Sequence, residues 1–112
     1  MNFRLDADIF SIIKNGVKDV EIRLYDDKRK KLKVGDKIVF YKRPEEIEKI
    51  ECTITKLEKY NSFSDVVDNI DMERIYLEGT SKEDYIKLMR RFYSEDEEKN
   101  LGVLAIYFKV DD

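Results

Sequence analysis

Hydrophobic and polar positions change period several times along the chain, which predicts short strands and helices in alternation. Apolar side chains at every second position over residues 3–5 predict a brief strand. Over residues 9–13 the apolar side chains fall on one face of a helix, with Asp6 or Asp8 as its cap. Gly16 supplies the expected end of that helix.

Three further stretches have the period of two that is typical of strands. In residues 18–25 the apolar positions alternate with charged ones, and residues 37–42 follow a turn at 34–36. A proline-containing loop at Pro44 then leads into residues 50–60, a run long enough to bend between two pairings. We therefore expect three strands in succession after the first helix.

The second half of the chain predicts two helices and a closing strand. Asn61 or Ser62 caps the first of these helices, and Ser81 with Asp84 forms an S-x-x-D capping box for the second. The strongly apolar residues 102–110 predict a strand in the interior of a sheet. The second helix is expected to turn four residues inward: Tyr85, Leu88, Met89 and Phe92.

This order of elements is β-α-β-β-β-α-α-β and predicts the α+β class. About five short, curved strands suit a small β-barrel that is mixed but mainly antiparallel, with flanking helices at one end. At 112 residues the chain is expected to form one domain, residues 1–112.

Charge is abundant and unevenly placed. Charged residues make up 42% of the chain and the net charge is −3. Residues 1–56 carry 14 basic and 11 acidic residues, whereas residues 57–112 carry 8 and 14. Basic residues are densest over residues 28–33, and two interpretations stand about equal: a solvated loop, or a patch that attracts phosphate.

The composition excludes several classes of site. The chain has no histidine and a single cysteine, Cys52, so histidine-dependent nucleophilic catalysis and zinc sites are excluded. Its four glycines form no phosphate-binding loop, and we expect neither a metal nor a cofactor. No apolar run is long enough to span a membrane and no secretion signal is present, which predicts a cytoplasmic protein without a membrane partner. Nothing in the pattern indicates an oligomeric state.

Lys18, Glu21, Arg23 and Tyr25 are the candidate binding residues. Glu21 and Arg23 lie two apart and share a strand face, whereas Lys18 joins them only if the chain turns near Gly16. The arginine offers a planar fork to phosphate or to a base carbonyl, and Tyr25 offers a ring for stacking. The plain alternative is an exposed Glu21–Arg23 ion pair worth less than about 1 kcal/mol.

Three segments together resemble a known family. These are G-x-K-x-x-E-x-R at residues 16–23, V-G-D-x-I-x-F at residues 34–40 and G-V-L-A-I-x-F at residues 102–108. The combination resembles the ASCH domain, a member of the PUA-like β-barrel superfamily, and the likeness covers nearly the whole chain.

The resemblance implies an RNA- or nucleotide-binding domain. Its ligand would be a single-stranded or modified nucleotide, recognised in a cleft lined by the G-x-K-x-x-E-x-R segment. Together with the basic stretch, this interpretation gives seven candidate ligand-binding residues: Lys18, Glu21, Arg23, Tyr25, Lys28, Arg29 and Lys30.

The same resemblance implies an alternative, a small hydrolase acting on a modified pyrimidine or on single-stranded RNA. One bacterial ASCH branch deacylates N4-acetylcytidine with a lysine, a threonine three residues later and a glutamate further on. The corresponding catalytic candidates here are Lys18, Glu21 and Glu78, so a glutamate stands where that branch has its threonine. A third class, a protein-interaction adaptor, would bind no nucleotide.

Overall fold

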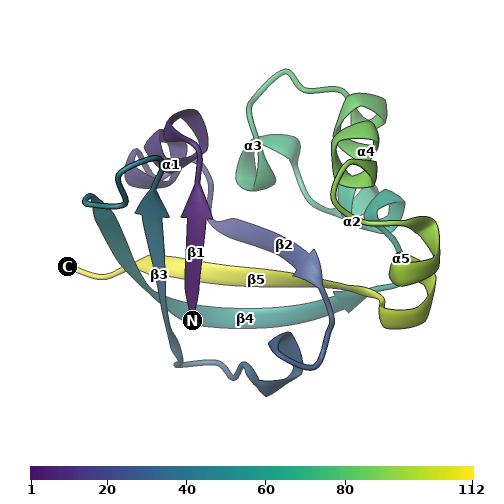
Figure 1. The fold of residues 1–112 in the computed structure, drawn as a ribbon, viewed down its shortest axis with the longest axis horizontal. Helices are drawn as coiled ribbons and strands as arrows, with labels where there is room; N and C mark the ends of the chain where they lie inside the picture. The colour runs from purple at the N-terminus through teal and green to yellow at the C-terminus, as the bar shows by residue number, and fades with distance from the viewer.

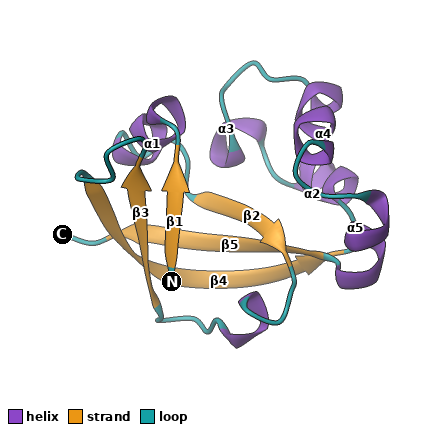
Figure 2. Cartoon of the chain, in the orientation of Figure 1, coloured by secondary structure: helices purple, strands orange, loops and turns teal.

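The computed structural model describes residues 1–112 as five strands with helices around them (Figures 1 and 2). In chain order the elements are β1 (Asn2–Leu5), α1 (Ala7–Lys14), β2 (Val20–Leu24), the 3₁₀ helix η1 (Arg29–Lys31), β3 (Lys37–Lys42), β4 (Lys49–Tyr60), α2 (Phe63–Asn69), α3 (Met72–Ile75), α4 (Lys82–Arg90), α5 (Glu95–Leu101) and β5 (Val103–Val110).

All five strands belong to one curled sheet in the order β1-β3-β4-β5-β2. The β1–β3 pair is parallel and the other three pairs are antiparallel. The long strand β4 pairs with β3 through its first half and with β5 through most of its length, with an irregularity between Ile54 and Lys56. The predicted α+β class, five-stranded mixed sheet and interior position of the last strand are confirmed.

Each face of the sheet buries its own hydrophobic core. Phe3, Phe40 and Phe108 pack together inside the curl, with ring centroids 5.5 Å and 4.9 Å apart in successive pairs. The second core lies between β2, β5 and the group of helices α2–α4, which covers one end of the sheet in Figure 1. Strand β5 contributes to both cores, because Leu104, Ile106 and Phe108 belong to the first and Val103 and Ala105 to the second. The apolar residues of β2, Val20, Ile22 and Leu24, face the helices.

The structure corrects several expectations about the second half of the chain. It contains α3 and α5, neither of which the hydrophobic pattern predicts, because α3 has four residues and α5 reads EDEEKNL. The first half also contains the unpredicted η1. Phe92 is 64% exposed beyond the end of α4, so its predicted place in the core is wrong. The complete capping box belongs to Ser94 and Glu97 of α5, whereas at Ser81 only the serine makes its bond.

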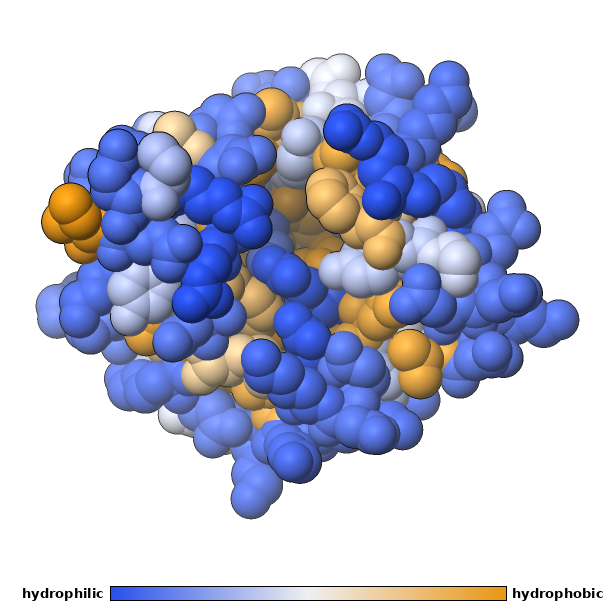
Figure 3. All heavy atoms as spheres, viewed as in Figure 1, coloured by the Kyte–Doolittle hydropathy of each residue, from blue (hydrophilic) through white to orange (hydrophobic).

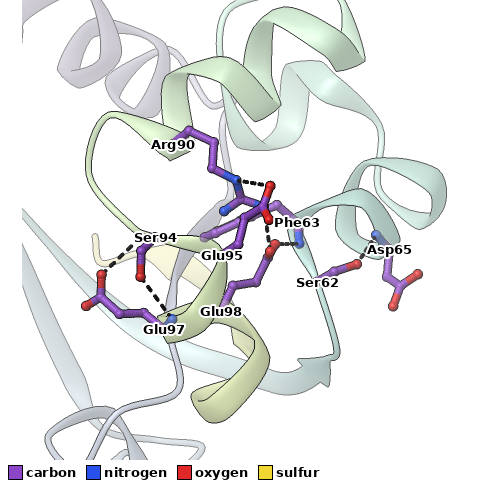
Figure 4. Close-up of polar contacts among 8 residues, drawn as sticks. All are labelled: Ser62, Phe63, Asp65, Arg90, Ser94, Glu95, Glu97 and Glu98. Atoms are coloured by element: carbon purple, nitrogen blue, oxygen red, sulfur yellow. Dashed lines mark hydrogen bonds and ion pairs between the residues drawn. The ribbon is translucent and has the colours of Figure 1, made fainter.

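A buried carboxylate joins the helices to one another (Figure 4). Glu98 of α5 accepts 2.7 Å from the backbone N–H of Phe63, at the start of α2, and 2.5 Å from Nη2 of Arg90 on α4. Because the first N–H groups of a helix have no partner within the helix, the carboxylate caps α2 while it holds α4.

The longest helix has nine residues, too few to cross a membrane.

Candidate functional site

A cleft of about 270 Å³ opens where the sheet fails to close on itself. Strands β1 and β2 are its two edges and are not paired with each other. Figure 3 shows a hollow on this face with hydrophobic residues inside it and hydrophilic residues around it. The cleft is lined by residues of β1 and the start of α1, of β2 and the turn before it, of the loop after β3, and of α3, α4 and the segments that follow them: Arg4, Leu5, Asp6, Ile9, Lys18, Glu21, Ile22, Arg23, Arg43, Ile75, Tyr76, Tyr85, Leu88, Met89, Phe92 and Tyr93.

Lys18 reaches the cleft because the chain turns between α1 and β2. Gly16 has φ 81°, a conformation that glycine adopts without strain. The backbone N–H groups of Val17 and Lys18 both donate to the carbonyl of Ile12, at 2.9 Å and 3.0 Å. Since β2 begins only at Val20, Lys18 is free of the strand's alternation and meets Glu21.

The Lys18 ammonium is fully occupied by the protein. Its Nζ lies 2.6 Å from the carbonyl of Val20, 2.7 Å from the carbonyl of Ile75 and 3.0 Å from Oε1 of Glu21. Three acceptors match the three N–H donors of an ammonium. Burial lowers the pKa of Lys18, while the Glu21 carboxylate works in the opposite direction. Lys18 therefore fixes β2, α3 and Glu21 in place.

Glu21 is held by two cations at once. Oε1 faces Lys18 and Oε2 accepts from Nη2 of Arg23 at 2.9 Å, and the residue is only 6% exposed. Burial alone would raise its pKa, but Lys18 and Arg23 together hold it below its ordinary value. The carboxylate is thus ionised and serves to orient the arginine.

Arg23 is the member of the trio that faces the cleft. Its side chain is 25% exposed, and its guanidinium carbon lies 4.6 Å from the centre of the Phe3 ring on β1. Tyr93, from the segment after α4, lies beside the Arg23 guanidinium in the cleft. Burial opposes the charge on Arg23, yet Glu21 raises its pKa above the ordinary value. A charged, oriented fork therefore spans the seam between the two edge strands.

Tyrosines form the facing wall. Tyr76 and Tyr85 meet edge to face, with centroids 6.0 Å apart. Neither hydroxyl makes a hydrogen bond within the protein, although Tyr85 is only 2% exposed. Burial raises the pKa of both hydroxyls, so they are neutral at physiological pH and offer a donor and an acceptor to the cleft.

The rim beside β1 is basic but partly neutralised. Arg4 forms a 2.8 Å ion pair with Glu46, and Arg43 lies 3.7 Å from Asp6. Both arginines are about half exposed, so these pairs are screened and exchange readily with solvent or another anion.

The other predicted residues lie outside the lining of the cleft. Tyr25 follows β2, with Nζ of Lys59 at 4.5 Å and Nζ of Lys30 at 5.6 Å from the centre of its ring. Lys28 is exposed in the same β2–β3 connection, where Arg29 bonds to the Asp26 carboxylate at 2.9 Å.

Glu78 is exposed in the loop between α3 and α4 and forms neither an ion pair nor a side-chain hydrogen bond. It is not among the residues that line the cleft. The structure therefore unites Lys18, Glu21 and Arg23 but does not bring Glu78 to them.

Sequence reasoning missed the cleft residues contributed by other elements. The sequence pattern gives no role to Tyr76 or Tyr93 and predicts only a core position for Tyr85. Their only sequence signal is the number of tyrosines, seven in 112 residues, which gives no partner or position.

The structure also has no group of three or more cysteine, aspartate or glutamate side chains placed to hold a metal ion.

The chain is similar to proteins of known structure and to a known family profile. The crystal structure of hypothetical protein PH0355 superposes with a TM-score of 0.80 at 27% identity, covering 99% of this chain and all of that one. The solution structure of protein PF0455 from Pyrococcus furiosus gives 0.75 at 30% identity, covering 97% and 94%. Comparison with curated proteins gave no significant match. The ASCH domain profile matches residues 4–111. The PUA-like curled sheet and the Lys18–Glu21–Arg23 cluster agree with that match. The chain therefore belongs to the ASCH domain family.

Proposed function

We propose that the protein binds single-stranded RNA by receiving one nucleotide in the cleft between β1 and β2. ASCH domains are commonly linked to RNA binding, and this cleft has the chemistry that the function requires. A nucleotide presents an aromatic base and an anionic phosphate, and the cleft offers aromatic side chains beside an oriented guanidinium.

The observation that carries the proposal is the state of Arg23. Its charge is fixed by Glu21 from one side and by the Phe3 ring from another, while its side chain stays 25% exposed in the cleft beside Tyr93. A guanidinium prepared in this way loses little freedom when it binds phosphate or a base carbonyl. Tyr76 and Tyr85 add neutral hydroxyls that suit the edge of a base.

The size of the cleft points to one nucleotide. Pockets for drug-sized ligands start at about 300 Å³, and this cleft has about 270 Å³. A paired base within a helix is not able to enter a space of that kind, whereas a base from a single strand turns out freely. The hydrolase alternative has less support, because Lys18 has no free donor and Glu78 lies outside the cleft.

The test is calorimetric titration of the wild type and Arg23→Gln with the four ribonucleoside monophosphates and with a short single-stranded RNA. Hydrogen bonds from a charged group are worth about 1.5–3 kcal/mol, so Arg23→Gln is expected to weaken binding by about 10- to 150-fold. Lys99→Gln is the matched control, since it removes one exposed cation from α5, away from the cleft. Equal affinities for Arg23→Gln and the wild type would overturn the proposal.

A further inference from the structure

The basic stretch between β2 and β3 has more uncompensated charge than the rest of the surface near the cleft. We call Lys28, Lys31 and Lys33 the basic ridge. All three are exposed and none forms an ion pair, whereas their neighbours Arg29 and Lys30 pair with Asp26 and Asp27. A positive potential therefore remains at the ridge.

The basic ridge is continuous with the cleft in two ways. Arg29, beside the ridge, lies 5.9 Å from the centre of the same Phe3 ring that Arg23 covers at 4.6 Å. Arg4 lines the cleft and also lines a shallow hollow whose other residues include Lys28 and Lys31. In Figure 3 hydrophilic residues continue from the hollow toward the lower edge of the molecule.

An aromatic ring stands beside this path. Tyr25 is half-buried, and its ring has the cations of Lys30 and Lys59 within 5.6 Å and 4.5 Å of its centre. An aromatic ring flanked by cations is the arrangement that binds single strands, because bases stack while phosphates contact the charges. The second half of the chain is acidic by contrast: residues 57–112 carry 8 basic and 14 acidic residues.

We infer that the single-stranded RNA extends beyond the cleft, with its backbone passing from Arg23 across Arg4 to the basic ridge. The inference rests on the proposed function and adds a direction and a length to it. The cleft receives one base, and the neighbouring phosphates of the same strand contact Lys28 and Lys31. A free mononucleotide would use the cleft alone, so a strand is bound more tightly than its parts.

The experiment compares wild type, the double variant Lys28→Gln/Lys31→Gln and the control Lys99→Gln/Lys109→Gln. The control removes the same charge from exposed lysines without ion pairs on α5 and β5. Binding is measured with a fluorescein-labelled single-stranded RNA of about eight nucleotides, within the usual site size, and with the four mononucleotides, over a range of salt.

The ridge variant is expected to bind the RNA about tenfold more weakly at low salt. Its slope of log affinity against log salt should fall by about 1.4, because each single-strand phosphate contact contributes about 0.7. Its affinity for mononucleotides, and both affinities of the control, should match the wild type.

The outcomes separate the two proposals. Failure of the wild type to bind any mononucleotide or the RNA overturns the proposed function. Normal binding of mononucleotides with an unchanged RNA affinity and salt slope in the ridge variant overturns this inference alone.

Discussion

Glu21 and Glu98 are both buried carboxylates paired with an arginine, yet they belong to different kinds of region. Glu98 binds the start of α2 and Arg90 of α4, so both of its oxygens hold helices together (Figure 4). Glu21 binds Lys18 and Arg23, and its arginine faces a cleft between unpaired sheet edges. Burial and pairing of a charge therefore do not by themselves distinguish a candidate binding site from a purely structural ion pair. The distinction lies in whether the partner cation still meets open space beside aromatic side chains.

Removing either carboxylate is expected to have the largest effect. Glu21→Ala leaves Lys18 and Arg23 without their buried carboxylate, and Glu98→Ala removes the buried carboxylate that binds Arg90 and the Phe63 N–H. Each variant should lower the free energy of unfolding by about 3–5 kcal/mol, as broken buried pairs do. Chemical denaturation provides the measurement.

Glu95→Ala is the control for that prediction. Its side chain is 84% exposed and lies 3.8 Å from Arg90, so its loss should cost less than about 1 kcal/mol. If Glu21→Ala were as mild as Glu95→Ala, the trio would not be a structural unit.

Substituting the arginine of each region should affect RNA binding differently. Arg23→Gln is expected to weaken binding of single-stranded RNA by about tenfold or more, since it removes a charged donor. Arg90→Gln should lower the free energy of unfolding. The RNA affinity of the folded variant should stay within about twofold of the wild type, because Arg90 does not line the cleft. Anisotropy titration at a temperature where both variants are folded makes the comparison. A loss of affinity in Arg90→Gln equal to that in Arg23→Gln would remove the distinction.

Acid should weaken the region around Glu21. Its folded pKa is held below the ordinary value of 4.5, so the ion pairs contribute stability above pH 4.5 that is lost as pH falls through the lower folded pKa. The carboxamide of Glu21→Gln does not titrate, so the free energy of unfolding of that variant should fall less than that of the wild type over this interval. Denaturation at a series of pH values tests this, and parallel curves for the two proteins would contradict it.

Tyr85→Phe is expected to have the smallest effect of these substitutions. The substitution removes a hydroxyl that has no partner within the protein, so stability should stay within about 0.5 kcal/mol of the wild type. If the hydroxyl bonds to a base, nucleotide affinity should fall about three- to tenfold. Unchanged affinity would show that this wall contributes only packing.

The hydrophobic pattern predicted the sheet better than the site. Alternation over β2 placed Glu21 and Arg23 on one face, whereas the position of Lys18 depended on a turn near Gly16 that the pattern alone left open. Such local relations are encoded in neighbouring residues. The short helices were missed because α5 is nearly all charged and buries only Glu98, a residue that periodicity counts as polar.

The facing wall of the cleft depends on long-range packing. Tyr76 and Tyr85 lie more than fifty residues from β2 along the chain, and nothing in their spacing relates them to Arg23. Only the fold shows that β1 and β2 remain unpaired and leave a cleft between them.

Binding of RNA in the cleft between β1 and β2 is tested by following backbone-amide chemical shifts during titration with single-stranded RNA. We expect changes over residues 16–23, at Tyr76 and Tyr85, and in the basic ridge, with none at Arg90 or Glu98. Changes centred on the α2–α4–α5 junction, with the Gly16–Arg23 segment unaffected, would contradict it.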